Sequence, residues 1–307
     1  MSILKDALES GKFGVTAEMA PPKGYDFTEQ MEAAELLRGK VHGVNVTDMQ
    51  SASLKATGLG LCIKLKQAGV EPILQMTGRD RNRMALMGDA LAAASFGIDT
   101  MLALTGDHPV VGDCKDAKPV YDLDSVGILK MLSKMEATGC DCGGNEIAGG
   151  APTFYKGASV TPVYEPIFLQ LNKLRQKVEA GAMYVQTQGI FDLDTFKRFI
   201  EKVDSMGIKT HIMAGIIPLK AAGMAKYMNE NVPGIDVPQD MIDRLAAAAA
   251  EGKEKGVKGL PMQLGIEMAA EMIAKIKDEK LCDGVHIMAI GAEKNVPTIL
   301  EKAGIAI

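Results

Sequence analysis

Residues 178–188, VEAGAMYVQTQ, contain the unit that decides the fold. A helical pattern ends near a glycine, and an apolar run with a β-branched residue follows directly. The glycine suits a left-handed helix C-cap, and the run suits a strand that is buried on both faces. The same order recurs in 66–76 (KQAGVEPILQM), 94–104 (ASFGIDTMLAL), 204–215 (DSMGIKTHIMAG) and 281–291 (LCDGVHIMAIG). Strands that alternate with helices in this way indicate parallel pairing with right-handed crossovers.

Eight strands are expected along the chain. They are 13–19 (FGVTAEM), 43–48 (GVNVTD), 71–77 (EPILQMT), 100–106 (TMLALTG), 153–160 (TFYKGASV), 182–188 (AMYVQTQ), 209–215 (KTHIMAG) and 284–291 (GVHIMAIG). Helical patterns fill the gaps, and 236–255 (DVPQDMIDRLAAAAAEGKEK) predicts an additional helix before the last strand. Eight strands in 307 residues favour an α/β fold of the (β/α)8 TIM barrel type, with residues 1–307 as a single domain. An open doubly wound sheet is the alternative.

Charge and hydropathy argue against several kinds of partner. Lys and Arg total 34 against 39 Asp and Glu, which gives a net charge of −5, and no basic block stands out. Nucleic acid and anionic membranes are therefore disfavoured as partners. The first residues, MSILKDALESGKF, are mixed in polarity, and no stretch approaches the roughly 20 apolar residues that a membrane span needs. We expect an untargeted cytoplasmic protein.

The five cysteines are an odd number, and we expect them to be reduced. Cys140 and Cys142 form a C-x-C pair that could hold a metal, but two thiolates without a second pair make an incomplete site. Loop thiols and no metal are the expectation.

Polar side chains gather where the predicted strands end. In barrels of this type the active site lies at the carboxyl ends of the strands. Those positions hold Glu18, Thr47, Asp48, Gln75, Thr77, Thr105, Asp107, Ser159, Gln186 and Gln188. Glu18 shares a strand face with Thr16 and is followed by apolar residues and two prolines, so dry surroundings would raise its pKa toward the range of a general acid. A rim carboxylate in an ordinary salt bridge is the competing interpretation.

Residues at two other strand ends also allow either a functional or a structural interpretation. Gly106 permits a tight turn that places Asp107 directly after its strand, where Asp107 serves the site or caps a turn. Gln186 and Gln188 alternate along one face, so both could point into the barrel. An amide can donate and accept together, which suits the edge of a pterin or flavin ring as well as a structural hydrogen bond.

Basic and imidazole side chains near the strand ends are less informative. Arg79, Arg81 and Arg83 could bind the phosphate or carboxylate group of a ligand, or form a solvated helix start. The histidines show no metal spacing, and of these His108 alone is expected to adjoin the site.

Five segments in this order resemble the methylenetetrahydrofolate reductase family. They are AEMAPP (17–22), VNVTD (44–48), LALTGDHP (102–109), KLRQKVEAGAMYVQTQGIFD (173–192) and AGIIPL (214–219). The resemblance covers essentially the whole chain. The ending at 284–305, GVHIMAIGAEKNVPTILEKAGI, is more similar to the variant found in bacteria that include acetogens than to the enterobacterial type.

The resemblance implies a flavin enzyme that reduces 5,10-methylenetetrahydrofolate to 5-methyltetrahydrofolate by hydride transfer, in the one-carbon metabolism of methionine biosynthesis or the acetyl-CoA pathway. Glu18 matches the general acid that opens the folate's five-membered ring, Asp107 a residue near flavin and pterin, and Gln188 the residue that holds the pterin. The resemblance and the strand-end positions together predict flavin contacts from Thr47, Gln75, Thr105, Gly106, Asp107, Tyr121, Ser159 and Lys177.

Departures from the family pattern affect the cofactor and the folate tail. Met224 stands where the enterobacterial type has a substrate-binding Gln, and the Arg near the last strand is missing. The segment 157–166, GASVTPVYEP, lacks the Tyr and His expected around the adenine of FAD, which favours FMN with FAD as the alternative.

The sequence allows two sources of electrons and more than one function. Electrons would come from NAD(P)H directly, or through a partner subunit that carries zinc or iron–sulfur centres, since the chain has no cysteine framework for a cluster. An oligomer is expected. A flavin-free barrel that passes the methyl group of methyltetrahydrofolate to a corrinoid protein is the alternative function, and a non-catalytic docking subunit, suggested by the 20 methionines, is a third.

Overall fold

The computed structural model describes residues 2–307, and its eight parallel strands close into a barrel in sequence order. The strands are β1 (Gly14–Met19), β2 (Gly43–Val46), β3 (Pro72–Thr77), β4 (Thr100–Leu104), β5 (Tyr155–Val160), β6 (Tyr184–Gly189), β7 (His211–Ile216) and β8 (Gly284–Ile287). The barrel closes where β1 pairs with β8, with Thr16 opposite His286. The predicted TIM barrel and its eight strands are confirmed, and the open sheet is excluded.

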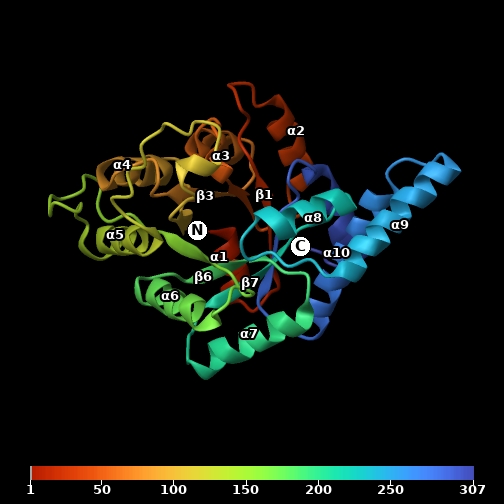
Figure 1. The fold of residues 1–307 in the computed structure, drawn as a ribbon. Helices are drawn as coiled ribbons and strands as arrows, with labels where there is room; N and C mark the ends of the chain where they lie inside the picture. Colours follow the sequence, from red (N-terminus) through yellow and green to blue (C-terminus); the bar gives the residue numbers. More distant parts are fainter. Residues whose placement is uncertain (1) are drawn as a thin grey trace.

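Helices surround the strands as a ring (Figure 1). They are α1 (Ile3–Glu9), α2 (Thr28–Leu37), α3 (Gly58–Gln67), α4 (Arg83–Ser95), α5 (Ser125–Thr138), α6 (Ile167–Glu179), α7 (Leu193–Ser205), α8 (Ala222–Asn231), α9 (Gln239–Lys255), α10 (Leu260–Asp278) and α11 (Val296–Lys302). The additional helix before the last strand is confirmed as α9, which extends outward from the ring in Figure 1. The sequence patterns did not predict α8, a short helix in the same connection.

The glycines that precede the strands behave as expected with one exception. Gly69, Gly97, Gly181 and Gly207 have positive φ angles between 65° and 108°, as a left-handed helix end requires. Gly284 does not, and the left-handed residue after α10 is Lys280. A side chain on Gly284 would lie 2.3 Å from the backbone oxygen of Gly14, so this glycine allows the close approach of β8 to β1.

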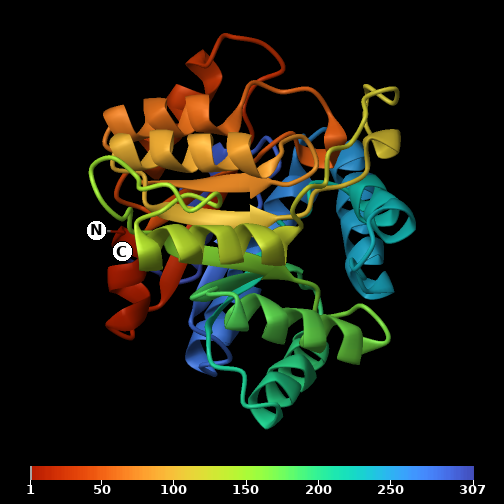
Figure 2. The same ribbon diagram turned by 90° about the vertical axis from the view of Figure 1, so that its left-hand side faces the viewer.

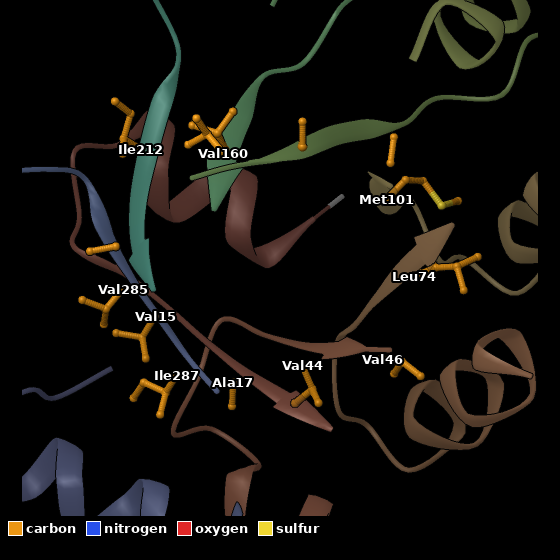
Figure 3. Packing of buried hydrophobic residues seen from close by; sticks show 14 of the residues in the cluster. Val15, Ala17, Val44, Val46, Leu74, Met101, Val160, Ile212, Val285 and Ile287 are labelled. Carbon is orange, nitrogen blue, oxygen red and sulfur yellow. The ribbon is translucent and has the colours of Figure 1, made fainter. Parts of the chain in front are cut away.

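The main core lies between the barrel and the helices. Strand residues such as Val15, Val44 and Leu74 are almost fully buried there, and Figure 3 shows their side chains on neighbouring strands. They pack with helix residues that include Leu61 and Leu132. Because the other face of each strand is enclosed inside the barrel, the strands are buried on both faces, which explains why their sequences are apolar runs rather than alternating patterns.

A second core fills the amino-terminal end of the barrel. Leu4 and Leu8 of α1 pack there with Tyr155 and Tyr184, whose rings stack 5.0 Å apart. Gly157 leaves the space that the Tyr184 ring occupies, because a Cβ at that position would lie 2.2 Å from the ring. Figure 2 shows α1 at this end of the barrel, opposite the loop that follows β4. The carboxyl ends of the strands are therefore the end that is left for a site.

Candidate active site

A cavity of about 460 Å³ opens at the carboxyl ends of the strands. All predicted site residues except Tyr121 line it, from six strands or the segments that follow them: Glu18, Thr47, Gln75, Thr105, Gly106, Asp107, Ser159, Lys177 and Gln188. Its size suits a cofactor or substrate pocket. The fold therefore brings these strand-end side chains together, although they are far apart in the sequence.

Glu18 lies beside a histidine that the sequence did not single out. The Glu18 side chain is 13% exposed, and its Oε2 atom lies 3.6 Å from Nε2 of His286. His286 Nδ1 is 2.9 Å from the hydroxyl of Thr16. When protonated, this imidazole forms an ion pair with Glu18, so the environment of Glu18 is polar on the barrel side.

A buried hydrogen-bond network continues below this pair. Gln186 Nε2 donates to the Thr16 hydroxyl at 3.1 Å and to Asn45 Oδ1 at 3.0 Å, and Asn45 Nδ2 donates back to Gln186 Oε1 at 2.8 Å. Because the Thr16 hydroxyl accepts from Gln186, its own hydrogen is free to donate to His286 Nδ1. This arrangement favours the His286 tautomer that carries its proton on Nε2, facing Glu18.

The expectation for the histidines was wrong. His286 lines the cavity, whereas His108 lies outside it, accepts a hydrogen bond from the backbone of Val110 and stacks near Tyr121. His286 sits inside an apolar run, and only the pairing of β8 with β1 brings it to Glu18.

The three arginines after β3 have different positions. Arg79 is buried in the cavity wall and donates to the backbone oxygens of Met49 at 3.0 Å and Asp107 at 3.2 Å. Arg81 forms an ion pair with Asp48, and Arg83 with Asp122. Arg79 thus ties the loops after β2 and β4 together, and all three arginines are held by carboxylates of the chain, Arg79 by Asp80 at 2.7 Å.

The turn after β4 depends on Gly106. Its φ is +89°, and a Cβ there would lie 2.2 Å from Thr77 Cγ2 and 3.1 Å from Arg79 Cβ. Tyr121 does not line the cavity; its hydroxyl donates to the Gly106 oxygen at 3.2 Å. Thr105 accepts from the backbone of Ser125 at 3.2 Å. The backbone of this turn therefore faces the cavity and is supported from behind.

A bulge shapes the end of β6. Gln186 pairs with Met213, but the next pair joins Gly189 to Gly215, so β6 has one extra residue. As expected, Gln186 and Gln188 both line the cavity, but Thr187 lines it as well, which simple alternation does not predict. Gln188 Oε1 accepts from the backbone of Gly189 at 3.0 Å.

Lys177 is a buried cation at the cavity wall. It is 9% exposed, and its Nζ donates to the Ser159 oxygen at 2.6 Å. Burial, with a smaller contribution from the nearby Lys173, lowers the pKa of Lys177 to about 8, and Asp124 partly opposes this shift. Its charge is therefore sensitive to pH just above neutrality.

No group of three or more His, Cys, Asp or Glu side chains within residues 2–307 is placed to hold a metal ion. In the same residues no helix is long and apolar enough to cross a membrane.

Comparison with known proteins relates the sequence to one family. The family described as "Methylenetetrahydrofolate reductase" matches residues 3–304. A "Probable methylenetetrahydrofolate reductase (NADPH)" of Caenorhabditis elegans is 25% identical over 83% of this chain and 34% of its own length. The "5,10-methylenetetrahydrofolate reductase" of Pectobacterium carotovorum is 27% identical over 68% of this chain and 65% of its own length. The chain spans about a third of the length of the eukaryotic relative.

A solved structure shares the fold. It is described as an uncharacterized protein from Clostridium thermocellum that binds two copies of 5-methyl-5,6,7,8-tetrahydrofolic acid. The TM-score is 0.64, with 14% identity over 99% of both chains. The family match over nearly the entire sequence shows that this chain belongs to the methylenetetrahydrofolate reductase family.

Proposed function

We propose that the chain catalyses the flavin-dependent reduction of 5,10-methylenetetrahydrofolate to 5-methyltetrahydrofolate. The observation that carries the proposal is the largely buried Glu18 carboxylate, which lines the cavity within 3.6 Å of His286. Family membership supports the substrate class. Residues 1–307 would act as one domain.

The residues around the cavity fit a flavin. The hydroxyl of Thr47 is buried, lines the cavity and has no hydrogen-bond partner within the described part of the chain. Gly106 contributes its backbone to the cavity wall, and Lys177 offers a cation. Thr47, Gln75, Thr105, Ser159 and the turn at Gly106 would hold the flavin, FMN rather than FAD, with Tyr121 behind them. When bound and reduced, the flavin would supply the hydride.

Glu18 would act as the general acid. The folate's five-membered ring must open before its methylene carbon can accept a hydride, and it opens when the bridging nitrogen receives a proton. His286 would orient the Glu18 carboxyl group through its Nε2 hydrogen, because the network through Thr16 directs that hydrogen toward Glu18. The proton that Glu18 gives to the folate would be restored from solvent in the cavity.

Gln188 and Asp107 would position the pterin. The Gln188 amide can donate and accept at the ring edge, and the Asp107 carboxylate can accept from ring N–H groups. The electron donor would be NAD(P)H or a zinc- or iron–sulfur-bearing partner subunit. We further propose that the protein is cytoplasmic and oligomeric.

The variant Glu18→Gln tests this role. We expect reduction of the bound flavin to proceed normally, while its reoxidation by methylenetetrahydrofolate slows by about a hundredfold or more, since the amide has no proton to give. Stopped-flow absorption of the two half-reactions measures both rates. Glu201→Gln, on the exposed face of α7, is the matched control. Equal rates for Glu18→Gln and the control would refute the general-acid role.

A further inference from the structure

A second cavity, which we call the tail cavity, adjoins the first at Glu18. It measures about 460 Å³ and lies between the segments that follow β1, β2 and β8. Glu18 and Gln50 line both cavities. The two spaces therefore meet at the carboxylate that would protonate the folate.

The chemistry of folates fixes where their tail begins. The bridging nitrogen that Glu18 would protonate is bonded directly to the aminobenzoyl ring, and the ring is joined through an amide to glutamate. Whatever the orientation of the pterin, the tail leaves from the atom next to Glu18. The tail cavity begins at this point.

The walls of the tail cavity match the successive parts of that tail. Ala20, Pro21, Pro22 and Ile290 supply apolar surface for a ring. The side-chain oxygen of Gln30 is buried and has no hydrogen-bond partner among residues 2–307. An unpaired buried acceptor costs stability unless a ligand supplies a donor, and the amide N–H of the tail is such a donor.

Lys55 is the cation that remains available in this cavity. Lys23 forms an ion pair with Asp113 at 2.5 Å, and Glu293 accepts from the backbone of Gly291 at 2.9 Å. Lys55 is half-buried and has no ion pair with any carboxylate in the described chain. Besides Glu18, the exposed Glu29 and the half-buried Glu293 are the opposing charges. A carboxylate of the glutamate tail would complete the pairing of Lys55.

We propose that the tail cavity binds the aminobenzoyl-glutamate part of the folate, with Lys55 pairing a glutamate carboxylate and Gln30 accepting from the tail amide. This inference rests on the proposed function and assigns the tail to residues of this chain.

The test compares two ligands with one variant. 5-Methyltetrahydrofolate carries the tail, and 6-methyltetrahydropterin lacks it. We expect Lys55→Ala to weaken binding of the folate by about tenfold and to leave binding of the pterin unchanged, and Lys55→Arg to restore most of the loss. Calorimetry gives the dissociation constants. Lys130→Ala, at an exposed lysine of α5, is the matched control.

Two results would overturn the proposal. Unchanged folate affinity in Lys55→Ala would show that the tail leaves by another route. Equal weakening for both ligands would show that Lys55 acts on the pterin or on the fold. A wild-type chain that binds neither ligand would refute the proposed function itself, and the tail assignment with it, whereas a wild type that binds both keeps the two questions separate.

Discussion

Replacement of Gly106 by alanine should damage both stability and the cofactor site. The residue has a φ of +89°, which costs an L-residue about 1–2 kcal/mol. The added Cβ would also lie 2.2 Å from Thr77 Cγ2, and such overpacking costs about 1–3 kcal/mol. Gly106→Ala should therefore lower the free energy of unfolding by about 2–5 kcal/mol, the sum of these costs.

The same substitution should weaken flavin binding, because relief of the clash moves the turn that carries Asp107 and contacts Arg79. Urea denaturation and fluorescence titration with FMN measure the two effects. Gly88→Ala is the matched control: this exposed glycine lies inside α4 with no atom within 4 Å of an added Cβ, so alanine should stabilise the helix by about 1 kcal/mol. If Gly106→Ala unfolded like the wild type and bound FMN equally well, the reasoning would be refuted.

Two further predictions concern charges at the cavity. Burial lowers the pKa of Lys177 to about 8, so its charge is present below that pH and is lost above it. The affinity for FMN should fall by up to about tenfold between about pH 8 and pH 9, and Lys177→Arg should remove this dependence. An identical pH profile in the wild type and in Lys177→Arg would count against contact between Lys177 and the flavin. His286→Gln should slow flavin reoxidation by methylenetetrahydrofolate and shift its pH profile, while flavin reduction stays unchanged. An unaltered profile in stopped-flow assays would exclude a role of His286 in positioning the Glu18 acid.

The architecture was readable from the sequence because its signals are local. Each helix, glycine and apolar run lies within about a dozen residues, and the flanking glycine and the β-branched residues distinguish a buried strand from a buried helical segment. Polar residues at strand ends were also recognisable, since Glu18, Thr47 and Gln188 interrupt apolar runs where these runs stop.

Features that depend on closure of the barrel could not be read in this way. Thr16 and His286 are 270 residues apart and meet because β1 pairs with β8. The position of Thr187 depends on a one-residue bulge, which shifts the alternation after Gln186. Helix α8 was missed because its segment, AGMAKYMNEN, is only ten residues long and has no side-chain cap.

The most direct test of the proposed reaction is the visible spectrum of the purified chain after incubation with FMN, followed by anaerobic titration with 5-methyltetrahydrofolate. We predict flavin absorption at about 450 nm that bleaches as methyltetrahydrofolate is added, because the reaction then runs in reverse and reduces the flavin. A protein that stays colourless with both FMN and FAD, yet binds methyltetrahydrofolate, would contradict the account and favour a flavin-free methyltransferase.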